Sequence, residues 1–333
     1  MALADQYLVR GELQKAYAVG EELLTIGART HNSEIVGRGR LMLATALHLS
    51  GNLSAAAEQI EQACRLPIGQ SSIKDSLGWD WQIATRTLAA NVWWPLGFPE
   101  RAKAKSAESL ELARNLPASP SGLMMTLFWS SIFNLQLRDW EQACPPIDEA
   151  RRLADEHGLV GMLPMIDMVR GRALVRRGQV EEGLTEMLRW ENVFKQAATI
   201  KLDFFHGLAD IYLALGRARE GLQAVNDALQ AVHAHGEVEA ELHRLKGELL
   251  LIHPEGTVAE AAQCFHDAIE IARRQSAKSW ELRATISLAR LLTNQGCRDE
   301  ARTMLAEIYN WFTEGFDTPD LKDAKALLDE LAT

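Results

Sequence analysis

Apolar residues recur along the chain at intervals of three and four positions, which is the spacing of one face of an α-helix. Leu41, Ala44 and Leu47 follow this spacing in the N-terminal part, and Leu288 and Leu292 follow it near the end. No segment alternates apolar and polar residues as a half-buried β-strand does. The pattern therefore predicts an all-α protein.

Turn signals interrupt the helical pattern at intervals of roughly 40 residues, which indicates a repeat architecture. Each signal is a glycine followed five positions later by a small residue, and an arginine replaces the glycine in the fourth repeat. Glycine after a helix can adopt the left-handed conformation that ends it, and small side chains let two antiparallel helices approach closely. The eight turn positions are Gly11, Gly51, Gly97, Arg138, Gly178, Gly216, Gly256 and Gly296.

Eight turns predict eight antiparallel helix hairpins. Neither helix of a hairpin can bury its apolar face alone, so successive hairpins must stack on one another. We expect residues 1–316 to form one right-handed superhelical solenoid. Its second helices are expected near residues 12–28, 53–66, 99–116, 140–157, 180–197, 218–235, 258–275 and 298–313.

Two irregularities and a distinct C-terminal segment modify this uniform array. The longest interval between turns contains a weakly helical stretch at 67–74, which we expect to be a surface loop. Two extra residues around Pro254 lengthen the seventh turn. Gly315 can end a helix and Thr318 can cap the next one, so residues 317–333 are expected to form a capping helix over the last repeat.

Composition narrows the classes of function. The chain of 333 residues is 47 % hydrophobic, which is enough to bury a core, and its net charge is −10. No basic stripe of the kind that nucleic acids or anionic lipids attract is present, so direct binding to nucleic acid or membrane is not expected. No apolar run reaches the length of a membrane span, and the chain is expected to be cytoplasmic.

The small-residue positions resemble the tetratricopeptide pattern, with a longer period. Three strings, at 240–249, 277–283 and 311–318, resemble the C-terminal helical region of particular bacterial multidomain proteins. Those proteins join a class III adenylate or guanylate cyclase, or a winged-helix regulator, to a signalling ATPase. The resemblance implies a sensing or partner-binding region, either a fragment of such a regulator or a freestanding relative. It brings no catalytic residue.

Catalytic and metal-binding motifs are not found. The phosphate-binding GxxxxGK[ST] loop and the HExxH and GxSxG motifs do not occur. His233 and His235 are two positions apart near a helix end, where they point to nearly opposite sides, so we expect solvated histidines. We therefore expect a protein that is not an enzyme and that holds no metal or cofactor.

In tetratricopeptide arrays the first helix of each hairpin lines the concave face, and inward positions can be counted back from each turn. The spacing predicts a groove that is aromatic and methionine-rich in its middle and charged towards its C-terminal end. It also places Leu135, Asp203, Arg283 and Arg290 inward. The principal groove residues are Thr87, Asn91, Trp94, Met125, Phe128, Ile132, Met165, Met168, Arg172, His206, Asp210, Glu241, Arg244 and Glu248.

Two kinds of occupant fit this groove. Methionine adapts to varied ligands, and aromatic residues and arginine anchor interfaces, so the first hypothesis is recognition of a protein or peptide segment. The alternative is a small-molecule effector held in a pocket of hairpins three to six, around Trp94, Phe128 and Met168. A homodimer through the apolar face of the terminal hairpin, around Leu3 and Leu8, is a further possibility.

Overall fold

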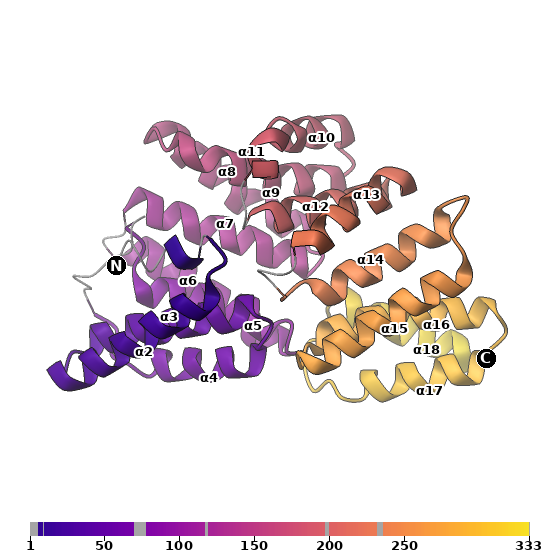
Figure 1. Cartoon of the computed structure of the whole chain (residues 1–333), viewed down its shortest axis with the longest axis horizontal. Helices are drawn as coiled ribbons and strands as arrows, with labels where there is room; N and C mark the ends of the chain where they lie inside the picture. Colours follow the sequence, from indigo (N-terminus) through magenta and orange to yellow (C-terminus); the bar gives the residue numbers. More distant parts are fainter. Residues whose placement is uncertain are drawn as a thin grey trace.

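The protein is all-α in the computed structural model, which describes residues 6–8, 10–69, 78–116, 119–196, 200–231 and 236–332. Within these ranges there is no β-strand, and helices follow one another with short connections (Figure 1). The helices are α2 (Leu13–Thr30), α3 (Ser33–Leu49), α4 (Leu53–Cys64), α5 (Trp81–Trp93), α6 (Pro99–Asn115), α7 (Pro120–Gln136), α8 (Trp140–Glu156), η1 (Val160–Met162), α9 (Leu163–Arg176), α10 (Val180–Leu188), α11 (Glu191–Gln196), α12 (Ile200–Ala214), α13 (Ala218–Ala231), α14 (Glu239–Ile252), α15 (Val258–Arg274), α16 (Lys278–Asn294), α17 (Arg298–Tyr309) and α18 (Pro319–Ala332).

Consecutive helices pack as hairpins, and the tetratricopeptide-like solenoid is confirmed. The pairs α3–α4, α5–α6, α7–α8, α9–α10, α12–α13, α14–α15 and α16–α17 are each in extensive contact. Each second helix begins within one residue of its predicted start. The C-terminal helix α18 packs on α16 and α17, and its apolar side chains join their core.

The turn residues have the predicted left-handed backbone in seven of the eight hairpins. Gly256 is the exception, since its φ angle is not positive. The two extra residues lengthen this turn, and α14 is ended instead by His253 in an extended conformation. Glycine is still needed at 256, because a side chain there would collide with the carbonyl oxygen of Leu250. In the fourth turn Arg138 has a φ angle of 61°, which costs a non-glycine residue about 1–2 kcal/mol.

The fifth second helix differs from its prediction, since α10 ends at Leu188 and a separate helix α11 follows. No proline or glycine causes this break. The intervening turn allows the indole of Trp190 to donate a hydrogen bond of 2.8 Å to Asp167, which is fully buried. Tertiary contacts therefore override the local helical pattern here.

Several predictions concern segments outside the described residues. Of the expected loop at 67–74, only 67–69 is described, and it is not helical. The pair His233 and His235 and the terminal residue Leu3 also lie outside the described ranges.

The array curves until its two halves meet. Figure 1 shows the N-terminal helices and the C-terminal helices side by side, with the middle repeats above them. The rings of Trp94 and Trp280 pack edge to face with centroids 4.6 Å apart. Beside them, the backbone N–H of Ser279 donates to the carbonyl oxygen of Pro95 at 2.9 Å. Hairpins three and eight are thus direct neighbours in space.

A second contact between the halves lies at the N-terminus of α6. This helix has no side-chain cap of its own. The carboxylate of Glu314 instead accepts from the backbone N–H groups of Glu100 and Arg101, at 2.8 and 3.2 Å. A carboxylate at a helix N-terminus satisfies free amide donors and complements the helix dipole. The chain after α17 therefore stabilises a helix of the third hairpin.

Candidate functional site

A cavity of about 350 Å³ lies where the curved array meets its own C-terminal end. The first helices of hairpins five to eight, α9, α12, α14 and α16, form most of its wall. The turn after α7 and the helix α18 complete it. We call it the charged cavity, because these charged side chains line it: Arg138, Arg172, Arg176, Arg244, Arg283, Arg290, Asp210, Glu241, Glu248, Asp320 and Asp323.

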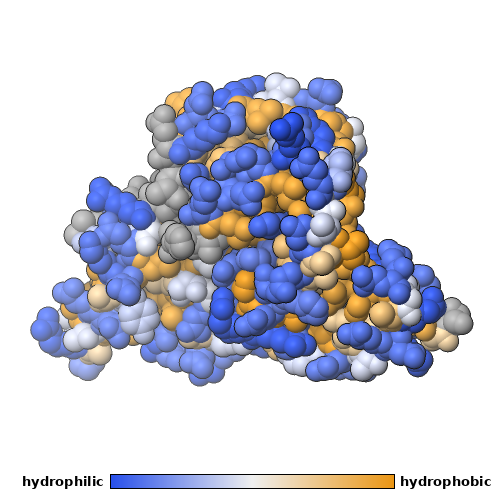
Figure 2. Space-filling model, turned by 45° about the vertical axis from the view of Figure 1, so that its right-hand side comes forward, coloured by the Kyte–Doolittle hydropathy of each residue, from blue (hydrophilic) through white to orange (hydrophobic). Residues whose placement is uncertain are grey.

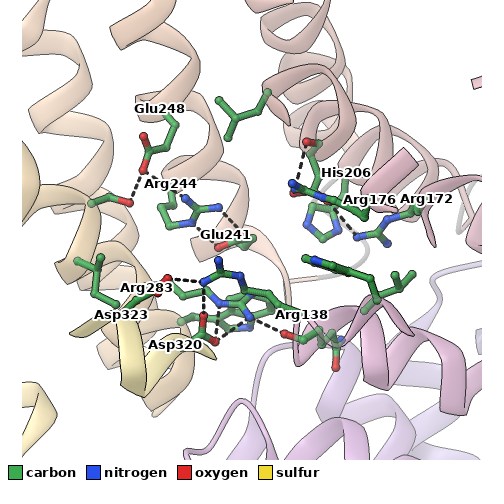
Figure 3. A pocket seen from close by; sticks show the side chains of 18 of the residues that line it. Arg138, Arg172, Arg176, His206, Glu241, Arg244, Glu248, Arg283, Asp320 and Asp323 are labelled. Carbon is green, nitrogen blue, oxygen red and sulfur yellow. Dashed lines mark hydrogen bonds and ion pairs between the residues drawn. The ribbon is translucent and has the colours of Figure 1, made fainter. Parts of the chain in front are cut away.

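The structure brings together the charged end of the predicted groove. Leu135, Arg283 and Arg290, which the spacing also placed inward, line the same cavity. Figure 3 shows the α14 side chains on one side of the cavity and those of α9 and α12 on the other. Six of the principal groove residues line the charged cavity: Arg172, His206, Asp210, Glu241, Arg244 and Glu248.

The apolar middle of the predicted groove is packed into the core instead. Trp94, Met125, Phe128 and Met168 are all buried, and Trp94 is only 2 % exposed. Phe128 and Met168 belong to the largest hydrophobic cluster, which runs through the middle repeats. Trp94 belongs to a second cluster, where Trp280 of the eighth hairpin packs against it.

The alternative hypothesis placed a small-molecule pocket around Trp94, Phe128 and Met168, but these three side chains are packed in the core. Ile132 and Met165 are half-buried and pack against the same core. Figure 2 shows hydrophilic residues over much of one face, with hydrophobic residues visible between them.

The remaining two groove residues, Thr87 and Asn91, line a different cavity. It has a volume of about 170 Å³ and lies among α3, α5 and α7. Its walls include Leu41, Met42 and Trp129, and we call it the apolar cavity. The residues of the predicted groove are thus divided among the charged cavity, the apolar cavity and the hydrophobic core.

One wall of the charged cavity is fully paired. The guanidinium of Arg244 forks onto the carboxylate of Glu241, at 2.7 and 2.8 Å, and reaches Glu248 at 3.4 Å. The three residues share one face of α14, because side chains three and four positions apart are neighbours on a helix. Burial lowers the pKa of Arg244, but the carboxylate of Glu241 outweighs burial and raises that pKa overall.

A second paired group joins the fourth turn to the C-terminal helix. Asp320, which is buried, accepts from Arg283 at 2.9 Å and from Arg138 at 3.3 Å. Arg138 also pairs with Asp323 at 2.7 Å, and Arg283 donates to the backbone carbonyl of Gln136. Arg138 stands where the other repeats have glycine, and its side chain crosses to a helix 182 residues away in sequence.

The third wall keeps a cation without a close partner. The Nε atom of Arg172 is buried and has no hydrogen-bond partner within the described residues. Its guanidinium lies 4.0 Å from Asp210, which pairs closely with Arg176 instead. Burial lowers the pKa of Arg172. Burial also raises the pKa of Asp210, but Arg176 and Arg172 outweigh it and bring that pKa down to about 2.

His206 lies on the same wall and is 8 % exposed. Burial, and next the charge of Arg172, lower its pKa to about 4, so the imidazole is neutral near pH 7. One turn earlier on α12, burial raises the pKa of Asp203 to about 6, against the effect of Arg172. Arg290, on α16, is exposed and has no ion pair among the described side chains.

Sequence spacing missed part of this site. Arg138, Trp140 and Arg176 line the cavity from the ends of helices or from turns, outside the inward positions that were counted. Asp320 and Asp323 come from the C-terminal helix, which belongs to no repeat. The one available signal was the arginine in the glycine position of the fourth turn.

The arrangement offers charge recognition. None of the described helices has the length and apolarity that crossing a bilayer demands. Across the described ranges, no three His, Cys, Asp or Glu side chains are grouped so as to hold a metal ion. What the cavity presents is a set of fixed guanidinium and carboxylate groups, some of them with unused hydrogen-bonding capacity.

Comparisons with known proteins agree with the fold. The family model for the tetratricopeptide repeat matches residues 37–62 and 282–307, which fall on the hairpins α3–α4 and α16–α17. No curated protein sequence matches the chain significantly. The solved structures that match share the fold at low sequence identity.

Three of these structures are relevant. The Rap protein complexed with competence and sporulation factor has a TM-score of 0.63 at 11 % identity, over 99 % of this chain and 95 % of that one. The Cut9–Hcn1 hetero-tetramer of APC/C has a TM-score of 0.54 at 13 % identity, over 99 % of this chain and 54 % of that one. A signal transduction ATPase with a tetratricopeptide repeat sensor, from Pyrococcus horikoshii, has a TM-score of 0.48 at 11 % identity, over 96 % and 49 %. The chain thus spans about half the length of the last two.

Proposed function

We propose that this chain is a non-catalytic binding module, and that its charged cavity recognises an acidic segment of a protein or peptide. The tetratricopeptide-like fold supports the general role, since two solved proteins of this fold, Rap and Cut9, are seen in complexes. The position of the charged cavity supports the specific role, which is recognition of an acidic segment. Successive repeats and the C-terminal helix each contribute side chains to it, as a bound segment running across several repeats requires.

The observation that carries the proposal is unused bonding capacity on the cavity wall. Arg172 has a buried Nε without an acceptor, and Arg290 has no carboxylate partner in the described ranges. The amide oxygen of Gln136 is also buried there without a donor. Carboxylates of a bound segment would pair with the two arginines, and a backbone N–H would satisfy Gln136. An unpaired buried polar group is costly, so a ligand that pairs it gains affinity.

We also propose a wider setting for this module. The strings at 240–249, 277–283 and 311–318 favour the sensing region of a bacterial signalling or transcription-regulating ATPase or cyclase regulator, in the cytoplasm. In that setting residues 1–316 act as one binding array, and 317–333 close its end. Self-association through the terminal hairpin remains a proposal.

Fluorescence polarisation with labelled peptides tests the binding proposal. Three sets of short peptides of equal length, acidic, basic and uncharged, would be titrated with the protein. We expect the acidic set to bind and Arg172→Ala and Arg290→Ala each to weaken binding roughly tenfold, as for loss of one charge-assisted hydrogen bond. Arg219→Ala is the control, because Arg219 is exposed on α13 and makes the same change of charge outside the cavity. Equal binding of acidic and basic peptides, or equal loss in the control, would contradict the proposal.

A second candidate function is the sensing of a small molecule. The apolar cavity favours this function. Its lining residues differ from those of the charged cavity, so this second candidate does not depend on the peptide proposal.

A further inference from the structure

The apolar cavity is large enough for a ring-sized ligand. Its volume of about 170 Å³ is comparable to that of an engineered apolar cavity, of about 150 Å³, that binds benzene. The aliphatic wall comes from α3 and α5, with Leu41, Met42 and Leu88, and the aromatic wall comes from Trp79 and Trp129. The indole of Trp79 already donates a hydrogen bond to Thr126, at 3.0 Å. These residues therefore form the hydrophobic walls, and any polar contact with a ligand must come from other residues of the lining.

Arg38 supplies a charge inside this apolar surrounding. The residue is only 6 % exposed, and it lines the cavity from α3. No hydrogen bond or ion pair joins it to any described residue. A guanidinium stays protonated in proteins. The nitrogen atoms of Arg38 are not among the fully buried polar atoms that lack a partner, so the guanidinium reaches the open space of the cavity.

The contrast with Arg86 shows that the fold can pair a buried arginine in this region. Arg86 is 3 % exposed on α5, one helix away. Its guanidinium pairs with Glu108 and donates to the backbone carbonyl of Gln82 at 3.0 Å. Arg38 has no equivalent carboxylate or carbonyl, although it is almost as deeply buried.

Asn91 adds a hydrogen-bond acceptor to the same cavity. Its Nδ2 donates to the backbone carbonyl of Thr87 at 3.0 Å. Its Oδ1 is buried and has no donor within the described part of the chain. The other polar residues of the lining, Thr45 and Thr87, donate their hydroxyls to backbone carbonyls of their own helices. The cavity therefore presents one cation and one free acceptor within a mostly apolar lining.

We propose that the apolar cavity binds a small organic monocarboxylate with a ring-sized apolar body. The carboxylate pairs with the guanidinium of Arg38, the ring lies between Trp79 and Trp129, and a hydroxyl of the ligand donates to Oδ1 of Asn91. Because both polar groups lack partners without a ligand, such a molecule satisfies them without displacing any protein contact. The cavity is lined by other residues than the charged cavity, so this site does not depend on the peptide-binding proposal.

Three related probes test the site: 4-hydroxyphenylacetate, phenylacetate and tyramine. The first two carry a carboxylate and the third carries an amine on the same kind of ring. Binding would be followed by isothermal titration calorimetry and by the thermal midpoint of the wild-type protein. We expect 4-hydroxyphenylacetate to bind best, phenylacetate more weakly, and tyramine not at all. Equal effects of the acid and the amine, or no binding of either acid at millimolar concentration, would overturn the proposal.

Variants then locate the interaction. Arg38→Met keeps the length of the side chain and removes its charge, so the affinity for phenylacetate should fall roughly tenfold to hundredfold. Arg40→Met is the matched control, since Arg40 lies on the same helix, bonds to Gln59 at 2.8 Å and does not line the cavity.

Asn91→Ala should reduce the advantage of 4-hydroxyphenylacetate over phenylacetate and leave phenylacetate binding in place. Unchanged affinity in Arg38→Met would overturn the proposal. If that variant does not fold, the wild-type comparison of acid and amine still decides the question.

Discussion

The charged cavity and the apolar cavity are built from the same kind of repeat, but they treat buried arginines in opposite ways. In the charged cavity, the buried Arg244 and Arg283 are held by carboxylates, and Arg172 keeps a loose contact with Asp210. The exposed Arg290 has no ion pair among the described side chains. In the apolar cavity, Arg38 is the one charged residue of the lining, and no hydrogen bond or ion pair joins it to a described residue. The first site can exchange ion pairs with a charged segment, whereas the second can gain its only ion pair from a ligand.

The two cavities also differ in which parts of the chain form them. The apolar cavity needs only neighbouring hairpins, because α3, α5 and α7 are successive first helices. The charged cavity needs the array to close, because the turn at Arg138 meets α18 and α16 there. The contrast teaches that stacking of neighbouring hairpins is enough to form one cavity, while the other forms only because the superhelix returns on itself.

The largest expected effect is the loss of the paired wall. Arg244→Met should destabilise the protein by about 3–5 kcal/mol, because Glu241, at 4 % exposure, would be left as a buried carboxylate without its partner. Urea unfolding measures this difference. Arg219→Met, on the exposed face of α13, is the control and should change stability by less than about 0.5 kcal/mol. If Arg244→Met lost as little stability as this control, the ion pair with Glu241 would not hold Arg244 strongly. The proposed difference between the arginines of the two cavities would then be wrong.

The next largest effect is a change of stability with pH, caused by His206 in the charged cavity. The pKa of His206 is about 4 in the folded protein and near 6.5 in the unfolded chain, so the unfolded state binds more protons between these values. The contribution of neutral His206 to the free energy of unfolding is thus fully present above about pH 6.5, and it is lost as the pH falls towards 4. Relative to His206→Gln, the wild type should gain up to about 3 kcal/mol across this window.

Unfolding series at several pH values measure this gain. The raised pKa of Asp203 acts in the opposite sense, with stability lost as the pH rises through about 6. That contribution is present in both proteins and cancels in the difference. A difference that does not change with pH would show that His206 is not held neutral by burial.

A smaller effect is expected at the loosely paired arginine. Arg172→Met should leave stability unchanged or raise it by about 1 kcal/mol, because Asp210 keeps Arg176 as its close partner. The same urea experiment measures it beside Arg244→Met. A decrease of more than about 2 kcal/mol in the free energy of unfolding would show that Arg172 is held by an ion pair, as Arg244 is, and is not unpaired as Arg38 is.

The smallest effect is expected in the fourth turn. Arg138→Gly should change stability by less than about 1 kcal/mol, because relief of the left-handed backbone offsets the loss of half-exposed ion pairs. Binding of 4-hydroxyphenylacetate should be unchanged, because Arg138 lines only the charged cavity. A changed affinity for that probe would show that the two cavities are coupled.

Part of the site could be predicted from spacing alone. Counting back from each turn found Arg172, Asp210 and Glu241, because a repeat fixes how a side chain is directed relative to its own helix. The same count placed Trp94 and Phe128 in an open groove, and this was wrong. Direction along a helix does not reveal which other side chains will cover a residue: Phe128 is covered within the core of the middle repeats, and Trp94 is covered by Trp280 from the eighth hairpin.

The sequence by itself determined the repeats: the turn positions, the starts of the second helices and the tetratricopeptide-like class of the fold. These depend on local backbone conformation and on contacts between successive hairpins, which recur in every repeat. Only the tertiary structure decided that the array closes, that Trp94 meets Trp280 and that Arg138 meets Asp320. Closure depends on the small rotation that accumulates from hairpin to hairpin, and no single repeat encodes that sum.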